Sequence, residues 1–158
     1  MHVDAALGGG SLLSKKYKRL LKGIEQSDSV SRSLHKMMNI PLLAAVLLTK
    51  DKDVLQRNFN EDVDYLFQMD DKDLNPANKH IQCGRRNDAL KVWTALKYLG
   101  DTGYEKRINN EFANAQYATQ VIKKDKDLKL MLEPECINIC FQVKGKSAEK
   151  ICEKLDQE

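Results

Sequence analysis

Two short stretches decide the fold prediction: Ser-Leu-His-Lys-Met-Met at residues 33–38 and His-Val-Asp-Ala-Ala at residues 2–6. Lys36 lies just before an apolar run, and Asp4 lies at the end of a short strand-like stretch. A lysine amine can form a Schiff base with an aldehyde cofactor, and an acid elsewhere in the same pocket can hold that cofactor's ring nitrogen protonated. We therefore take Lys36 and Asp4 as candidate partners in one cofactor site.

Composition indicates one globular domain of ordinary size. The chain has 158 residues, of which 42% are hydrophobic and 31% charged, with a net charge of +3. No apolar run approaches the roughly 20 residues of a membrane helix, so we expect no membrane association. The mild net charge by itself predicts no nucleic-acid partner. The basic residues between positions 15 and 22 suit contact with nucleic acid or an anionic membrane as an alternative. We favour a solvated helix face, because Tyr17 falls on the apolar side and no aromatic residue for base stacking is interleaved on the basic side.

The cysteines and the N-terminus favour a cytoplasmic protein. The four cysteines include no Cys-x-x-Cys pair, and the three histidines lie far from them in sequence, so we expect no metal site. Scattered cysteines in a chain of this size are typical of reduced thiols in the cytosol. The first ten residues lack a basic segment followed by an apolar core, so we expect no signal peptide.

Alternating strand and helix patterns predict an α/β fold. Residues 2–6 are expected to end a short buried strand, and the apolar run 42–49 suits a strand covered on both faces. A helix with one apolar side is predicted over 11–23, between these two strands. A crossover of this kind would bring Asp4 and Lys36 to the carboxyl ends of neighbouring strands, where active groups of open α/β sheets lie.

The second half of the chain predicts helices followed by two strands. Residues 60–79 contain five aspartates around Tyr-Leu-Phe and are predicted to form a long mobile loop, either a functional lid or a plain surface connection. Apolar spacing of three and four predicts a helix over 84–99, ended by Gly100, and a second helix to about residue 124. Further elements are expected as a short helix in 51–58, a strand within 27–32, strands at 128–132 and 137–142, and a last helix over 147–155 with Ala148, Ile151, Cys152 and Leu155 buried.

Six motifs, taken in order, carry a family resemblance. They are the stretch 2–6 followed by Gly8-Gly9, Ser29-Val30, His-Lys-Met-Met at 35–38, Tyr-Leu-Phe-Gln at 65–68, Ile-Gln-Cys-Gly-Arg-Arg at 81–86, and Glu-Pro-Glu at 133–135. Together they resemble the group II pyridoxal-phosphate decarboxylases, in the branch of glutamate, cysteine sulfinate and aspartate decarboxylases. The resemblance implies part of the large domain of a fold-type-I pyridoxal-phosphate transferase fold, with the start of its small domain.

The resemblance also implies a role for each site residue. Lys36 would carry the Schiff base with pyridoxal 5'-phosphate, and Asp4 would pair with its ring nitrogen. Ala6 would lie against the ring, and both Ser33 and His35 would lie near the phosphate. Tyr65, on the mobile catalytic loop 60–79, would return a proton to the substrate carbon in the partner subunit of a homodimer.

The resemblance further implies a domain division and a substrate class. Residues 1–125 would belong to the large domain and 126–158 to the small one, in an enzyme that decarboxylates an acidic amino acid. Members of the family are about three times as long, which favours a fragment of a longer enzyme. The alternative is a degenerate, non-catalytic remnant that serves as a binding or dimerisation module.

Overall fold

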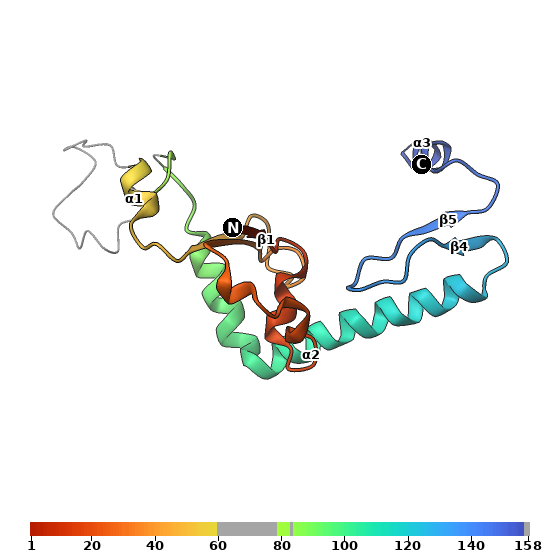
Figure 1. The fold of residues 1–158 in the computed structure, drawn as a ribbon, viewed down its shortest axis with the longest axis horizontal. Coiled ribbons are helices and arrows are strands. Elements are labelled where there is room, and N and C mark those ends of the chain that lie inside the picture. Colours follow the sequence, from red (N-terminus) through yellow and green to blue (C-terminus); the bar gives the residue numbers. More distant parts are fainter. Residues whose placement is uncertain (60–78, 83, 157–158) are drawn as a thin grey trace. The chain divides into compact units, whose positions relative to one another are not determined.

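The computed structural model describes residues 1–59, 79–82 and 84–156, so the predicted loop lies almost entirely outside the described residues (Figure 1). The described chain forms two compact units. The first comprises Met1–Leu7 and Lys22–Tyr98, and the second comprises Gly8–Leu21 and Leu99–Glu158. Among the described residues, the helices are all too short or too polar to cross a membrane.

A three-stranded sheet organises the first unit. Strands β1 (His2–Asp4), β2 (Ser29–Ser33) and β3 (Ala45–Thr49) stand in that order, with β2 in the centre. β1 and β2 run parallel, which requires a crossover connection, whereas β2 and β3 run antiparallel. This order confirms the predicted α/β class and the strand positions. It also places the carboxyl ends of β1 and β2 at the same end of the sheet.

The predicted burial of the strands is wrong for much of the sheet. β1 alternates exposed and half-buried residues, and on β3 Leu47 and Leu48 keep 48% and 52% of their surface. Neither face of β3 is therefore fully covered by described residues. The core of this unit lies instead around the loop between β2 and β3, where Leu34, Met37, Met38, Ile40 and Ala44 are buried, together with Ala5 after β1.

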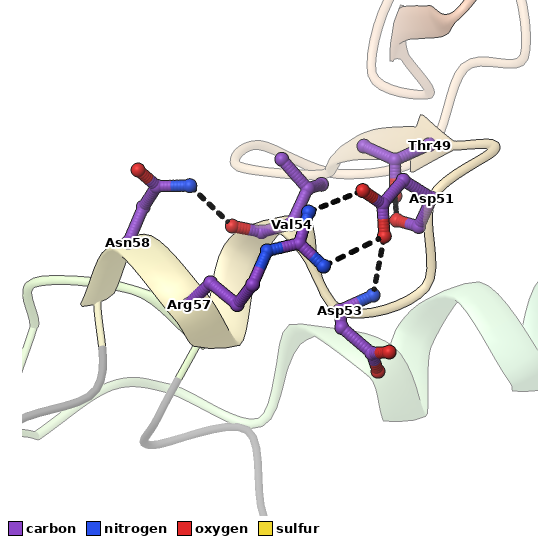
Figure 2. Close-up of polar contacts among 6 residues, drawn as sticks. All are labelled: Thr49, Asp51, Asp53, Val54, Arg57 and Asn58. Atoms are coloured by element: carbon purple, nitrogen blue, oxygen red, sulfur yellow. Dashed lines mark hydrogen bonds and ion pairs between the residues drawn. The ribbon is translucent and has the colours of Figure 1, made fainter.

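A polar turn joins β3 to the short helix α1 (Val54–Phe59), which confirms the helix predicted there (Figure 2). The Asp51 carboxylate accepts a hydrogen bond from the Asp53 N–H at 3.0 Å and forms an ion pair with Arg57. The Arg57 guanidinium, followed by the Asp53 N–H, holds the pKa of Asp51 below its ordinary value. Negative charge at this end of α1 also favours its first turn.

The helix predicted over 11–23 is replaced by 3₁₀ turns. Their bounds are η1 (Gly8–Leu13), η2 (Lys18–Leu21) and η3 (Ile24–Gln26). The fully buried Ser14 explains the break between the first two: its hydroxyl donates to Asn109 Oδ1 at 2.7 Å and accepts from the Tyr17 N–H at 3.3 Å. Side chain to backbone bonds of this kind compete with a regular helix.

Helix α2 (Asp88–Lys124) covers both predicted helices. Gly100, with φ 58° and ψ −175°, has non-helical backbone and bends it at the predicted boundary. Helical spacing of apolar residues predicts six buried positions on the second half; five of them are buried, and Thr119 is buried in place of the sixth, Ala118. On the first half, by contrast, Trp93 is 58% exposed. The buried positions of the second half are Tyr104, Ile108, Phe112, Ala115, Thr119 and Ile122.

The rest of the second unit is a small sheet and a helix. β4 (Leu128–Leu130) and β5 (Phe141–Val143) pair antiparallel. They confirm a strand in each predicted region, but the second begins at Phe141 and not at residue 137. α3 (Ala148–Leu155) confirms the last helix, but none of its residues is buried and Leu155 is 67% exposed. The predicted burial on this helix is therefore wrong, because no described segment covers its apolar side.

Candidate active site

Asp4 ends β1 with one carboxylate oxygen fully engaged. Its Oδ1 accepts the Ala6 N–H at 2.9 Å and the Ser31 hydroxyl at 3.3 Å. The Ala6 N–H, then the Ser31 hydroxyl, and more weakly the charges of Lys36 and His2 hold the pKa of Asp4 below its ordinary value. The side chain is exposed, so it stands ionised at the sheet edge at neutral pH.

A run of backbone contacts connects Asp4 to Lys36. The Ser33 N–H donates to the Ala6 carbonyl at 3.3 Å, and the Lys36 N–H donates to the Ser33 carbonyl at 3.2 Å. The register of the parallel strands sets this arrangement, since Asp4 lies opposite Ser31. The acid and the lysine therefore leave the same end of the sheet, from neighbouring strands.

The loop after Lys36 is closed by its own backbone. The Asn39 N–H donates to the Lys36 carbonyl at 2.8 Å, and Asn39 adopts a left-handed backbone with φ 52°, a conformation that asparagine tolerates. The Leu34 N–H donates to the Ala44 carbonyl at 2.8 Å. Met37 and Met38 are buried beneath this turn, which leaves the Lys36 side chain on the exposed side.

His35 is turned toward the backbone of Ala44. Its Nδ1 lies 2.7 Å from the Ala44 carbonyl oxygen and 3.2 Å from the Ala44 nitrogen. A carbonyl only accepts, so the shorter contact favours the tautomer with hydrogen on Nδ1. In that tautomer Nε2 is an acceptor.

Arg32 occupies the face of β2 opposite Ser31 and Ser33, because side chains alternate along a strand. Its guanidinium is half-buried, donates to Met38 Sδ at 3.6 Å, and has an Nε without a hydrogen-bond partner among the described residues. Burial lowers the pKa of Arg32 from its ordinary value. The Met38 thioether offsets only a small part of the cost of burying the Arg32 cation, so Arg32 adds little stability beneath the loop that follows β2.

The structure brings together four of the six predicted site residues: Asp4, Ala6, Ser33 and Lys36 are linked by the contacts above. His35 lies in the same loop, and Tyr65 lies outside the described residues. Ser31 contacts the acid directly, and it is not among the residues predicted from the sequence. The signal that could have found it is its place two residues before Ser33, because residues two apart in a strand lie on one face.

One cavity among the described residues lies apart from these side chains. In the second unit a cavity of about 380 Å³ is lined in part by Tyr17, Phe112, Lys123 and Cys136. Across the part of the chain that the structure describes, His, Cys, Asp and Glu side chains do not gather in threes to hold a metal ion.

A family model described as "Pyridoxal-dependent decarboxylase conserved domain" matches residues 1–144. The chain belongs to this family. The match covers both the Asp4 and the Lys36 segments, and it confirms the resemblance inferred from the motifs.

Curated relatives place the chain beside decarboxylases of acidic substrates. The family member "acidic amino acid decarboxylase GADL1" of Bos taurus is 45% identical over 145 residues, which cover 89% of this chain and 28% of that protein. The cysteine sulfinic acid decarboxylase of Homo sapiens is 42% identical, with 89% and 29% covered. The chain thus spans less than a third of the length of the curated relatives it matches.

Solved structures confirm the fold of the family. The crystal structure of mouse CSAD matches with a TM-score of 0.82 and 37% identity, covering 99% of this chain and 34% of that one. The structure of Oryza sativa TDC with PLP and tryptamine matches with a TM-score of 0.81 over 90% of this chain and 30% of that one; at 24% identity it supports the fold alone. The expected part of a pyridoxal-phosphate decarboxylase fold is therefore correct.

Proposed function

We propose that this chain supplies the lysine-bearing segment of a pyridoxal-phosphate-dependent decarboxylase that acts on an acidic amino acid. The observation that carries the proposal is that an ionised Asp4 and an exposed Lys36 lie at the same end of two neighbouring parallel strands. The relatives named for acidic amino acid and cysteine sulfinic acid decarboxylation support this substrate class.

The residues present fit the cofactor. A protonated pyridine nitrogen needs an anionic acceptor, and Asp4 is held ionised by hydrogen bonds to one of its oxygens. An aldehyde needs an exposed amine, which Lys36 offers, and Ala6 presents a small side chain beside the acid. When bound, pyridoxal phosphate supplies an electron sink for the carbanion that loss of CO2 would leave.

Each remaining residue keeps its proposed role. Lys36 would hold the cofactor aldehyde as a Schiff base, and Ser33 and His35 would contact the phosphate. Tyr65, from the segment 60–79, would donate the proton to the substrate carbon. We further propose that residues 1–125 belong to the large domain and 126–158 to the small domain of a longer, cytoplasmic, homodimeric enzyme.

A second function, a non-catalytic binding or dimerisation module, is favoured by the residues before His35. The family usually has Trp-Asn-Pro at positions 32–34, where this chain has Arg32, Ser33 and Leu34. Leu34 is buried, and unlike proline it does not fix the backbone φ of the turn. The Nε of Arg32 is buried without a hydrogen-bond partner among the described residues. A remnant of this kind would keep the fold while losing the phosphate contact.

Borohydride trapping distinguishes the two functions. The purified chain is mixed with pyridoxal phosphate, reduced, digested and read by peptide mass spectrometry. We expect one dominant adduct on Lys36 that disappears in Lys36→Ala and persists in Lys50→Ala, a control at another exposed lysine. Diffuse labelling of many lysines, unchanged by either substitution, would refute the proposed function and favour the non-catalytic module.

Turnover is the second measurement. Glutamate, aspartate and cysteine sulfinate are offered to the wild-type chain and to Lys36→Ala. We expect weak or no CO2 release from the 158 residues alone. Release that requires Lys36 would show that the isolated chain is itself a decarboxylase.

A further inference from the structure

The described part of β1 and β2 carries a row of polar side chains on one face. His2 and Asp4 lie on the same face of β1, because they are two residues apart, and Ser29, Ser31 and Ser33 lie on the same face of β2 for the same reason. The parallel register sets His2 opposite Ser29 and Asp4 opposite Ser31. The His2 imidazole and the Asp4 carboxylate on β1 therefore each lie opposite a serine hydroxyl on β2.

The two pairs differ in the group with which the serine hydroxyl forms its hydrogen bond. His2 Nδ1 lies 2.8 Å from the Ser29 hydroxyl, one pair away from the candidate site. Ser31 instead donates its hydroxyl to Asp4 Oδ1, at 3.3 Å. Its carbonyl also accepts the Ala5 N–H at 2.9 Å, so the same residue holds the backbone directly after the acid.

We infer that Ser31 is a positioning residue that fixes the Asp4 carboxylate through Oδ1 and leaves Oδ2 for the cofactor's ring nitrogen. The inference rests on the proposed function. Both hydrogen bonds to this carboxylate end on Oδ1, and among the described residues none reaches Oδ2. A carboxylate held at one oxygen cannot rotate freely, so its second oxygen keeps one direction.

The charge on Asp4 depends on the same contacts. The groups that face it are the Ala6 N–H, the Ser31 hydroxyl, Lys36 and His2. Ser31 is the one of these that a substitution removes without deleting a charge or changing the backbone donor. Its O–H···O distance is long, so the effect of removing it is modest.

The experiment compares four proteins: wild type, Ser31→Ala, Ser31→Thr and Ser29→Ala. The Asp4 carboxyl is titrated by carbon-13 NMR, without cofactor. We expect the pKa of Asp4 to rise toward its ordinary value in Ser31→Ala and to stay low in Ser31→Thr, which keeps a hydroxyl. Ser29→Ala is the matched control on the same face, and it should leave Asp4 unchanged.

The second readout is capture of pyridoxal phosphate on Lys36 by borohydride at subsaturating cofactor. Loss of one hydrogen bond predicts about a two- to tenfold fall in capture for Ser31→Ala, and none for Ser31→Thr or Ser29→Ala. Thermal unfolding is measured in parallel. An equal loss of capture in Ser29→Ala would indicate general damage to the sheet and would overturn the inference.

The two proposals fail in different ways. If no variant, including the wild type, captures pyridoxal phosphate on Lys36, the proposed function fails and Ser31 has no cofactor to position. If the wild type captures it while the Asp4 titration and the capture are the same in Ser31→Ala, the inference about Ser31 fails and the proposed function stands.

Discussion

Replacing Phe112 by alanine should unfold the second unit locally. Phe112 lies on α2 with 5% of its surface exposed, and its ring lies 3.6 Å, centroid to centroid, from that of the buried Tyr17. The rings are nearly parallel, at 8°. This contact joins the 3₁₀ turns of residues 8–21 to the long helix, beside the hydrogen bond between Ser14 and Asn109.

Burial sets the size of the effect more than ring stacking does. Removing a buried Phe side chain costs about 3–5 kcal/mol, through lost transfer free energy and the cavity left behind. Parallel rings at full overlap are less favourable than offset or edge-to-face pairs, so we add nothing for stacking. Small native domains have a total stability of about 5–15 kcal/mol, and a loss of this size removes much of it.

Hydrogen–deuterium exchange of peptides from residues 104–122 is the assay, because it reports local opening free energy. Phe112→Ala should bring these amides close to unprotected exchange. Tyr117→Ala removes an aromatic ring from the same helix at a position that is 70% exposed, and it should change protection by less than about 0.5 kcal/mol. Equal exchange in the two variants would refute the assigned packing.

Two further predictions concern the turn before α1 and the bend in α2. Arg57→Gln should raise the pKa of Asp51 toward its ordinary value of 3.8, while Arg57→Lys should keep it low, as read by carbon-13 NMR. Since the folded pKa is the lower one, this contact stabilises the turn above pH 3.8 and is lost as the pH falls through the lowered value. Gly100→Ala should cost about 1–3 kcal/mol in urea unfolding, because φ 58° with ψ −175° is open to glycine almost alone. Gly84→Ala, with no atom within 4 Å of the added Cβ, is its control, and a similar loss there would contradict the strain argument.

The sequence predicted the elements that depend on local pattern. The strand at residues 45–49 follows from an apolar run, and the buried face of α2 from Tyr104 to Ile122 follows from spacing of three and four. The candidate site was predictable because Asp4 ends one strand and Lys36 comes shortly after another. Their joint position then depends on β1 and β2 running parallel, as the structure has them.

What failed depends on partners distant in sequence. The pattern of residues 11–23 suits a helix, but Ser14 bonds to Asn109, ninety-five positions away, and the segment becomes 3₁₀ turns. Burial of β3 and α3 was overestimated because an apolar pattern shows which side of an element is hydrophobic, but not whether another segment packs against that side. Ser31 was missed because the register that sets it against Asp4 is a property of strand pairing.

The brevity of β1 has a consequence for how a ligand would act on this chain. β1 has three residues, lies at the edge of its sheet among the described strands and carries Asp4. Short edge elements open at a small fraction of the global unfolding free energy, so the acid is present only while this strand is docked. A cofactor that needs Asp4 binds the docked state alone and so raises its population by mass action. Ligand occupancy and order at the start of the chain would then rise together, and protection of the amides of residues 2–6 would become a direct gauge of binding.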